Sequence, residues 1–423
     1  MSSNVDTADK PAIGISHRDC CRVCGASALT RFLHLPQMPF TDEFPPTADA
    51  GQEFLADINV YVCERCWTAQ TRHDVDVASY YEDYQYSVGG SSAAARFMRI
   101  LAENLQARYF PGVTGRKVLE VGSGDGGQLL AFKEIGCEVL GYEPSSGLCK
   151  AARASGLDTV QGLFTESSAR LLPADFQKVD VIALSYTFDH LPDPRAFLRA
   201  CGGILDQRHG LLVVEVHDFE KIVERREYCL FEHEHSVYLT EAAAQYLCGL
   251  EGFEIVDFDL VAQEKRRANS LIFVATPQGS DHAFKRTAPR TPKAYFDLSH
   301  YERIGADVRK GIENLDAFVQ GVIDSGKRVC GYGAGGRGVM TLAAMRNASK
   351  LQYLVDKQPK GQGLLVPKSR IPLVGLPQLA AEPVDEVIVF SFGYMKEIKA
   401  ELLALGYQPG QLHSLLDLLG GQR

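Results

Sequence analysis

The stretch Val118-Leu119-Glu120-Val121-Gly122-Ser123-Gly124-Asp125-Gly126-Gly127 decides the fold class of this chain of 423 residues. An apolar strand contains the carboxylate Glu120 and is followed by three alternate glycines, Gly122, Gly124 and Gly126. Glycines let the backbone approach a ligand closely, and the N-terminus of the helix expected after them has partial positive charge. A second acid, Glu143, ends the next strand, where a carboxylate can accept hydrogen bonds from the two hydroxyls of a ribose. The pattern predicts a cofactor site, with dinucleotide binding or an unliganded turn as alternatives.

Strands and helices alternate around this loop. A helical pattern covers 93–108, and apolar strand patterns cover 117–121, 138–142, 179–184, 211–216 and 271–275. This rhythm predicts an α/β fold with a mainly parallel sheet covered on both faces. Residues 276–292, with three prolines, have the composition of a linker. A helix over about 297–325 and strands at 328–332, 351–355 and 386–390 then predict a second, smaller α/β domain.

The first part of the chain contains two cysteine pairs, Cys21-x-x-Cys24 and Cys63-x-x-Cys66. Four thiolates in two such knuckles suit a tetrahedral zinc ion, and four protein ligands leave no open position, so the metal is expected to be structural. Cys20 fits the two-residue spacing less well than Cys21. Incidental pairs or a redox dithiol are the alternatives. The predicted domains are a zinc-binding domain over 1–85, a central domain over 86–280 and a C-terminal domain over 281–423.

Composition narrows the classes of partner. The 44 basic and 53 acidic residues give a formal net charge of −9, which argues against nucleic acid or an anionic membrane as a partner. The polar N-terminus and the lack of a long apolar run predict a cytoplasmic protein without a membrane span. The eleven cysteines are then expected to be reduced. We expect a small-molecule substrate and a monomer or small homo-oligomer.

Two further segments contain titratable residues at the places where ligands bind in open α/β sheets. Ser185 and His190 follow the strand predicted at 179–184, at the carboxyl edge of the sheet. His190 belongs either to the site or to a surface turn. The densest titratable cluster is Glu232-His233-Glu234-His235-Ser236-Val237-Tyr238. A metal site at His233 and His235 lacks an evident third ligand, and a solvated charge cluster is the other alternative.

The Glu-x-Gly-x-Gly-x-Gly form resembles motif I of class I S-adenosylmethionine-dependent methyltransferases, in which the carboxylate faces the cationic amino-acid end of the cofactor. The resemblance narrows at 232–238 to the sugar C-methyltransferases that act on nucleotide-linked keto-deoxysugars. Their pattern, Tyr-x-Glu-His followed three residues later by Tyr, is matched at Glu234, His235 and Tyr238, whereas Glu232 stands at the usual tyrosine. The resemblance implies that the following residues bind the cofactor: Glu120, Gly122, Gly124, Gly126, Glu143 and Ser185.

The same family is similar over the whole chain. Its zinc domain matches the cysteine knuckles, and its C-terminal signatures match residues 331–338, Gly-Tyr-Gly-Ala-Gly-Gly-Arg-Gly, and residues 356–363. The family implies a Rossmann-like C-terminal domain that helps to bind the substrate. Without the family, this loop is a second G-x-G-x-x-G with Asp356 twenty residues past Gly336, so dinucleotide or diphosphate binding competes. The expected substrate-binding residues are Glu232, His233, Tyr332, Gly333, Arg337 and Lys360.

The implied reaction is methylation of carbon 3 of a 4-keto sugar, whose ketone acidifies the proton there. His235 is the expected general base, because an imidazole is mostly neutral at cytoplasmic pH. Glu234 is expected to orient it or to accept from a sugar hydroxyl, and His190 and Tyr238 to donate to the enolate oxygen. Rival hypotheses are methylation of another small natural product at oxygen, nitrogen or carbon, an NAD-dependent oxidoreductase using the second glycine loop, and a zinc-stapled binding protein without catalysis.

Overall fold

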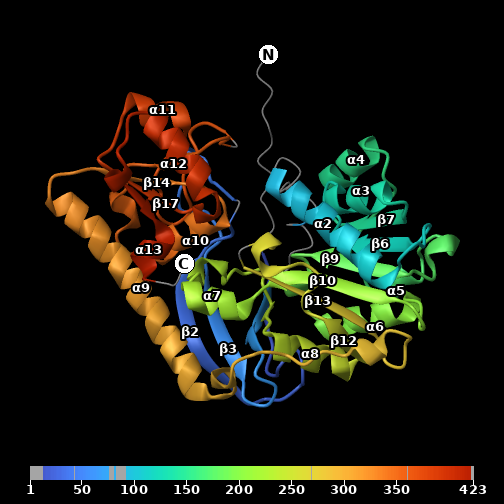
Figure 1. Ribbon diagram of the computed structural model, residues 1–423. Coiled ribbons are helices and arrows are strands. Elements are labelled where there is room, and N and C mark those ends of the chain that lie inside the picture. Colours follow the sequence, from blue (N-terminus) through green and yellow to red (C-terminus); the bar gives the residue numbers. More distant parts are fainter. Residues whose placement is uncertain are drawn as a thin grey trace.

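The central sheet has seven strands in the order β12-β13-β10-β9-β6-β7-β8 (Figure 1). The computed structural model describes residues 13–41, 43–75, 81, 92–267, 269–359 and 361–420. Strands β8, β7, β6, β9 and β10 run parallel, and β13 and β12 are antiparallel additions at one edge. The bounds are β6 Lys117–Val121, β7 Glu138–Glu143, β8 Thr159–Gln161, β9 Val181–Ser185, β10 Leu211–His217, β12 Phe253–Asp257 and β13 Ser270–Pro277.

Helices cover both faces of this sheet because alternate strand residues point to opposite sides. Val118 and Val213 pack with α2 and α3, whereas their neighbours Leu119 and Val214 pack with α6 and α8. All five predicted strands and the predicted helix at 93–108 are confirmed to within a few residues. The helices are α2 Ser92–Tyr109, α3 Gly127–Glu134, α4 Ser146–Ala154, α5 Glu166–Ala169, α6 Pro194–Ile204, α7 Phe219–Arg225 and α8 Glu241–Leu250.

The zinc-binding domain contains a four-stranded sheet in the order β11-β4-β3-β2 and a separate β1–β5 pair. Strand β11 comes from the central part of the chain. It joins this sheet because Val237 and Tyr238 pair with Gln70 and Ala69 of β4. The loop before Tyr238 is therefore anchored in the first domain. The bounds are β1 Ile15–His17, β2 Leu29–Met38, β3 Ala56–Cys63, β4 Ala69–Thr71, β5 His73–Val75 and β11 Val237–Tyr238.

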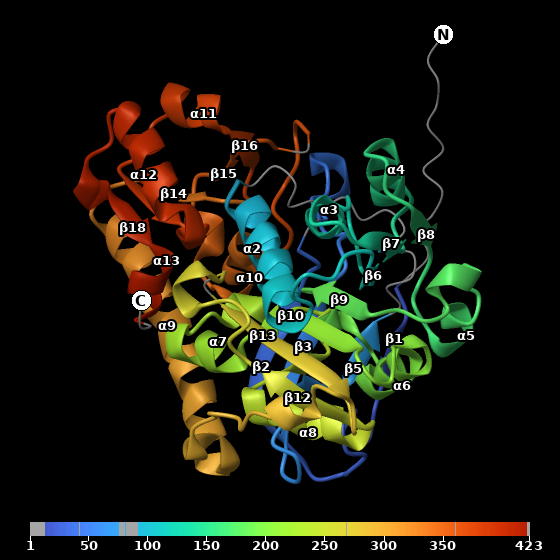
Figure 2. The ribbon, with the colours of Figure 1, turned by 45° about the vertical axis from the view of Figure 1, so that its right-hand side comes forward.

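The C-terminal domain has a five-stranded parallel sheet in the order β16-β15-β14-β17-β18, as a Rossmann-like domain requires. The long helix α9 was expected over 297–325, spans Leu298–Asp324 and lies along β2 (Figure 2). The expected linker begins later, because residues 276 and 277 belong to β13, where the buried Thr276 hydroxyl donates to Gly210 O. The remaining bounds are β14 Val329–Tyr332, β15 Leu354–Asp356, β16 Leu373–Gly375, β17 Glu386–Val389, β18 Leu412–Ser414, α10 Gly336–Ala344, α11 Leu376–Ala381, α12 Met395–Ala404 and α13 Leu415–Leu419.

One hydrophobic core joins the first and last domains with the segment before β11. Phe32 from β2, Phe219 from α7 and Tyr301 from α9 contact one another, with ring centroids 5.3–6.3 Å apart. Phe231 and Tyr238 flank the titratable cluster and belong to the same core. This packing holds the 232–238 segment from both sides. Among the described residues, no helix is long and apolar enough to cross a membrane.

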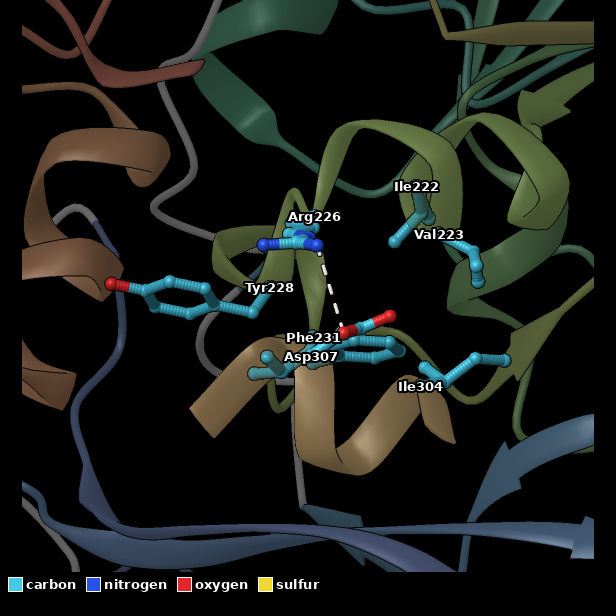
Figure 3. Close-up of a pocket in the computed structure, with 8 residues that line it drawn as sticks. Ile222, Val223, Arg226, Tyr228, Phe231, Ile304 and Asp307 are labelled. Carbon is cyan, nitrogen blue, oxygen red and sulfur yellow. Dashed lines mark ion pairs between the residues drawn. The ribbon is translucent and has the colours of Figure 1, made fainter. Parts of the chain in front are cut away.

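A small cavity lies between α7 and α9 (Figure 3). The ion pair of Arg226 and Asp307, 3.6 Å between Nη2 and Oδ1, crosses it. Its volume of about 10 Å³ is room for about one water molecule, so we assign it no ligand. Its lining residues are Ile222, Val223, Arg226, Tyr228, Phe231, Ile304, Asp307 and Val308.

Candidate active site

The four expected cysteines converge. Their sulfurs lie within 4.8 Å of one another, with Cys21 Sγ 3.6 Å from Cys66 Sγ and Cys24 Sγ 3.5 Å from Cys63 Sγ. Gln70 Nε2 donates to Cys21 Sγ at 3.0 Å, as a partner of a metal-bound thiolate does. Cys20 is exposed and outside the cluster. This donor set fits tetrahedral zinc, with every position filled by protein.

The first glycine loop also has the expected geometry. Gly122 has φ of +73°, and a Cβ there would lie 2.2 Å from Thr187 Oγ1, so only glycine fits. Glu143 accepts hydrogen bonds from Gly124 N (2.8 Å) and Ser145 N (2.9 Å). Burial raises the pKa of Glu143, and these two bonds oppose that shift. The carboxylate is thereby fixed beside the loop at the carboxyl edge of the sheet.

Glu120 is a buried carboxyl group, and a bound cation would stabilise its ionised form. Its side chain is nearly inaccessible, and within the described part of the chain Oε2 has no hydrogen-bond partner. Burial, then the charges of Glu143 and Asp125, raise its pKa well above the usual value. An ammonium or sulfonium group would relieve this cost. The orphaned oxygen and the glycine cradle therefore fit S-adenosylmethionine.

Three histidines meet at the same edge of the sheet. His190 follows β9, His217 ends β10, and His235 comes from the loop before β11. The ring of His235 lies 4.7 Å from that of His190 and 4.9 Å from that of His217, centroid to centroid. Adjacent parallel strands β9 and β10 end at the same edge, which explains the meeting of His190 and His217. His190 Nδ1 shares a 2.6 Å hydrogen bond with the Tyr81 hydroxyl.

The surroundings of the three imidazoles shift their pKa values in different directions. Burial and neighbouring His235 lower the pKa of His190 to about 3. Burial also lowers the pKa of His217, although Asp189 opposes the shift. For His235, the carboxylates of Glu232 and Asp189 outweigh burial and raise the pKa. His235 is therefore the histidine of this group that binds a proton most readily.

Asp189 and His217 are site residues that the sequence analysis missed. Asp189 Oδ2 lies 2.6 Å from His217 Nδ1, and the carboxylate is buried. Side-chain atoms of Asp189, His217 and His235 all lie within 4.8 Å of one another. The rule that selected His190, a titratable residue directly after an apolar strand, applies equally to His217 after 211–216. Applied consistently, it would have found this residue.

Arg267 is a third residue missed from the sequence. Its guanidinium lies 4.8 Å from the centre of the Tyr186 ring and 5.0 Å from that of Phe97, and Nη2 lies 3.3 Å from Glu215 Oε2. Its positive charge opposes the raised pKa of Glu120. Arg267 thus places a cation near Glu120. A single arginine outside a motif gives no signal in the sequence.

His233, Tyr332 and Gly333, which were expected to bind the substrate, have other surroundings. His233 points into the zinc-binding domain, where Nε2 contacts Met38 O at 2.9 Å and Nδ1 contacts His73 Nε2 at 3.1 Å. Burial lowers its pKa to about 4, so it is neutral. Tyr332 donates to Glu401 Oε2 at 2.5 Å within the C-terminal core. Gly333 is packed against Ser391, and Lys360 lies outside the described residues.

Tyr238 and Glu234 are both buried near the cluster. The Tyr238 ring centroid is 4.8 Å from that of Phe231 and 6.2 Å from that of His235. Ser185 ends β9 beside Glu215, with which it pairs in the sheet register. These three expected residues therefore lie around the histidines or at the same sheet edge.

The C-terminal domain reaches the site through Arg337. Its Nε lies 3.5 Å from Glu227 Oε2, and its charge lowers the pKa of His217. Gly336 precedes Arg337 in the chain, and a Cβ added to Gly336 would lie 2.9 Å from Glu232 Oε1. The N-terminus of α10 therefore faces the carboxylate of Glu232, a favourable arrangement for an anion. Asp356 Oδ2 accepts from Ala334 N at 3.2 Å, repeating the Glu143–Gly124 contact of the central domain.

Three family models match successive parts of the chain. One described as "Putative zinc binding domain" matches residues 21–81, one described as "Methyltransferase domain" matches residues 93–258, and one described as "C-methyltransferase C-terminal domain" matches residues 289–414. The expected order of zinc, methyltransferase and C-terminal domains is thereby confirmed, and the central domain has the class I methyltransferase fold.

The chain is also similar to individual proteins. The C-methyltransferase NovU of Streptomyces niveus is 27% identical over 388 residues, 90% of this chain and 91% of that protein. The ubiquinone biosynthesis O-methyltransferase of Idiomarina loihiensis is 34% identical over 99 residues, 22% of this chain and 40% of that protein. Among solved structures, the CcbJ methyltransferase of Streptomyces caelestis aligns with a TM-score of 0.35 and 17% identity, over 51% of this chain and 99% of that one.

Proposed function

This chain belongs to the S-adenosylmethionine-dependent C-methyltransferases with an N-terminal zinc domain, and from that membership we propose that it methylates carbon 3 of a nucleotide-linked 4-keto-deoxysugar. The observation that supports a carbon acceptor is the cluster of His190, His217 and His235 next to the pocket of Glu120. A carbon acid must lose a proton before it can accept a methyl group, so it needs imidazoles that an oxygen acceptor can often do without.

The cofactor supplies an electrophilic methyl group on a sulfonium. Glu120 would hold its positively charged amino-acid end, and Glu143, fixed by Gly124 N and Ser145 N, would accept from the ribose hydroxyls. Arg267 is placed to pair with a carboxylate. The loop of Gly122, Gly124 and Gly126, together with Ser185 at the end of β9, brings the backbone against this ligand.

The acid–base groups are proposed to be His235, Glu234, His190 and Tyr238, joined by the Asp189–His217 pair. They line the carboxyl edge of the sheet, where the acceptor carbon and its ketone would lie. The ketone oxygen needs a positioned donor as negative charge develops on it. A protonated imidazole can supply that bond, and a neutral one can take the proton from carbon.

The nucleotide part is proposed to bind the C-terminal domain. Arg337 and Gly336 approach the site from that domain, since the charge of Arg337 adds to burial in lowering the pKa of His217 and a Cβ on Gly336 would meet Glu232. Glu232 occupies the direction in which the N-terminus of α10 points. We propose that Arg337 binds the diphosphate and that Glu232 and the N-terminus of α10 face the sugar; Lys360 remains a proposal from the sequence resemblance alone.

Calorimetry on the zinc-replete protein with S-adenosylhomocysteine bound tests this function. Titration with TDP, UDP, GDP and CDP should show selective binding of one nucleotide, and the matching 4-keto-6-deoxysugar nucleotide should then accept a methyl group. If none of the four binds to protein whose cofactor site is filled, the substrate has no nucleotide. A change of absorbance at the nicotinamide band with NADH and a keto sugar would instead support an oxidoreductase. The contact between Asp356 and Ala334 N in the second glycine loop is the observation that favours this alternative.

A further inference from the structure

A guanidinium with unused donors lies at the carboxyl edge of the central sheet. Arg267 comes from the loop between β12 and β13, and its side chain is 22% exposed. Its Nε and Nη2 atoms are nearly inaccessible, and among the residues that the structure describes neither atom has a hydrogen-bond partner. A buried charged group without hydrogen bonds is costly, so this arginine is expected to serve a ligand.

Glu215 holds the guanidinium by charge without using these donors. Arg267 Nη2 lies 3.3 Å from Glu215 Oε2, yet the two atoms form no hydrogen bond. The other oxygen of Glu215 accepts from the hydroxyl of Ser270 at 2.8 Å. Nε–H and Nη2–H lie on one edge of a guanidinium, and this fork matches the two oxygens of a carboxylate. Arg267 therefore keeps an edge suited to a carboxylate.

Two aromatic rings restrict the orientation of this guanidinium. Its central carbon lies 5.0 Å from the centre of the Phe97 ring on α2 and 4.8 Å from that of the Tyr186 ring. Tyr186 has φ of +50°, a left-handed conformation that is costly for a tyrosine. Its hydroxyl donates to Asn269 Oδ1 at 3.3 Å. Such backbone strain is retained mainly at functional sites, which fits a ring that orients a ligand-binding arginine.

The ion pair of Arg267 lies on the same face of the sheet as Glu120. Glu120 pairs with Ala183 of β9, and Glu215 pairs with Ser185 two residues further along that strand. Residues two apart in a strand point to the same face, so Glu120 and Glu215 share one face. It is the face of α2, because Ala183 packs in the cluster that contains this helix. One acidic and one basic side chain are thereby placed towards the same small volume.

We infer that the fork of Arg267 binds the carboxylate at the amino-acid end of S-adenosylmethionine, while Glu120 pairs with the ammonium group at that end. The two groups are attached to one carbon, so a site for both needs an acidic and a basic side chain close together. The orphaned oxygen of Glu120 and the fork of Arg267 meet this need. The inference deepens the cofactor placement of the proposed function and does not depend on the sugar.

Analogues of the cofactor test the carboxylate contact directly. The zinc-replete, full-length protein is titrated by calorimetry with S-adenosylhomocysteine and with its decarboxylated analogue, which keeps the ammonium group and the adenosine. We expect Arg267→Met to weaken binding of S-adenosylhomocysteine by about 10–100-fold and binding of the analogue by less than about twofold, because only the first ligand loses a charge-assisted hydrogen bond. The preference of wild type for the carboxylate should therefore largely disappear.

Arg116→Met is the matched control. Arg116 lies 4.8 Å from the centre of the Phe110 ring and pairs with Asp180, and its side chain is 25% exposed. It stands just before β6 begins, at the opposite edge of the sheet. The variant should bind both ligands as wild type does. Arg267→Lys keeps a positive charge beside Glu215 but lacks the fork, so it should fold and still lose most of the preference.

Nitrogen-15 NMR of arginine-labelled wild type checks the contact without relying on a substitution that could affect folding. The Nε–H signal of Arg267, assigned by its loss in Arg267→Lys, should move downfield when S-adenosylhomocysteine binds. The decarboxylated analogue should leave it in place. A signal that responds equally to both ligands would show that the fork receives no carboxylate from the cofactor.

The outcomes separate this inference from the proposed function. If wild type binds the two ligands equally, or if Arg267→Met and Arg267→Lys keep the full preference, the fork serves Glu215 or the methyl acceptor and the inference is wrong. The proposed function is untouched by that result. If the preference depends on Arg267 but no nucleotide sugar binds or is methylated, the proposed function fails and the carboxylate contact stands.

Discussion

Arg22 Nη1 donates a hydrogen bond to the carbonyl oxygen of Pro192 at 2.8 Å. Arg22 stands between Cys21 and Cys24 in the first zinc knuckle, and Pro192 ends the loop that bears Asp189 and His190. The same guanidinium pairs with Asp74 and donates to the carbonyl of Thr71. The zinc knuckle is thereby connected directly to the loop that bears Asp189 and His190.

Arg22→Ala should destabilise the protein by about 1–3 kcal/mol, because the carbonyls of Thr71 and Pro192 lose the donor that the buried guanidinium supplies, while Asp74 keeps its ion pair with Arg18. Urea unfolding measures this loss. We expect zinc to remain bound, because the substitution touches no sulfur. A variant with wild-type stability and activity would show that the Arg22–Pro192 bond is dispensable.

Removal of one zinc ligand should have a larger effect. Cys24→Ser is expected to lower the zinc content and, for a loss of about 3 kcal/mol, the first unfolding midpoint by about 6–12 °C. Cys20→Ser is the matched control, since that thiol is exposed and outside the cluster. Equal zinc content in the two variants would contradict the assigned ligand set.

Glu120→Gln should change stability and affinity in opposite directions. The pKa of Glu120 is raised in the folded protein, so its ionised form destabilises the ligand-free protein above the unfolded pKa near 4.3. The variant should melt higher than wild type at pH 7, with the difference gone near pH 4. The affinity for S-adenosylmethionine should fall by about 10–100-fold, because a charge-assisted hydrogen bond is lost. Calorimetry and thermal melts at both pH values measure these effects.

His233 makes stability depend on pH. Its folded pKa of about 4 lies below the unfolded value of about 6.5, so the unfolded chain binds the extra proton in that window. Stability is therefore fully present above about pH 6.5 and falls by up to about 1.4 kcal/mol per unit as the pH drops towards 4. His233→Gln should reduce this slope in urea unfolding, and His34→Gln, at an exposed imidazole, should not. Identical slopes for both variants would remove His233 from this account.

Arg337→Gln should separate substrate binding from cofactor binding. Glu227 retains its ion pair with Arg225 Nη1 at 3.2 Å, so the fold should tolerate the change. We expect KM for the nucleotide sugar to rise by about 10–100-fold, with affinity for S-adenosylhomocysteine unchanged. Arg346→Gln, which removes a mostly exposed arginine of the same domain, is the control. An unchanged KM would place the diphosphate elsewhere.

Local sequence was sufficient for the features whose residues are neighbours in the chain. The glycine loop, the central strands and the long helix α9 all follow from patterns within a few consecutive residues. The two cysteine pairs also identified their common cluster, because zinc accepts few other spacings. The short edge strands β8, β12, β16 and β18 were missed, since a strand of three to five residues is defined by its partner more than by its own pattern.

The sequence by itself therefore determined the domain order, the cofactor loop and the zinc ligands. Only the tertiary structure decided which titratable residues lie together. His233 and His235 are two positions apart, yet one contacts Met38 and His73 of the zinc domain and the other joins His217. The strand register of β9 and β10 and the anchoring of β11 on β4 bring Asp189, His217 and His235 together. Such contacts depend on packing between distant segments, which no local pattern records.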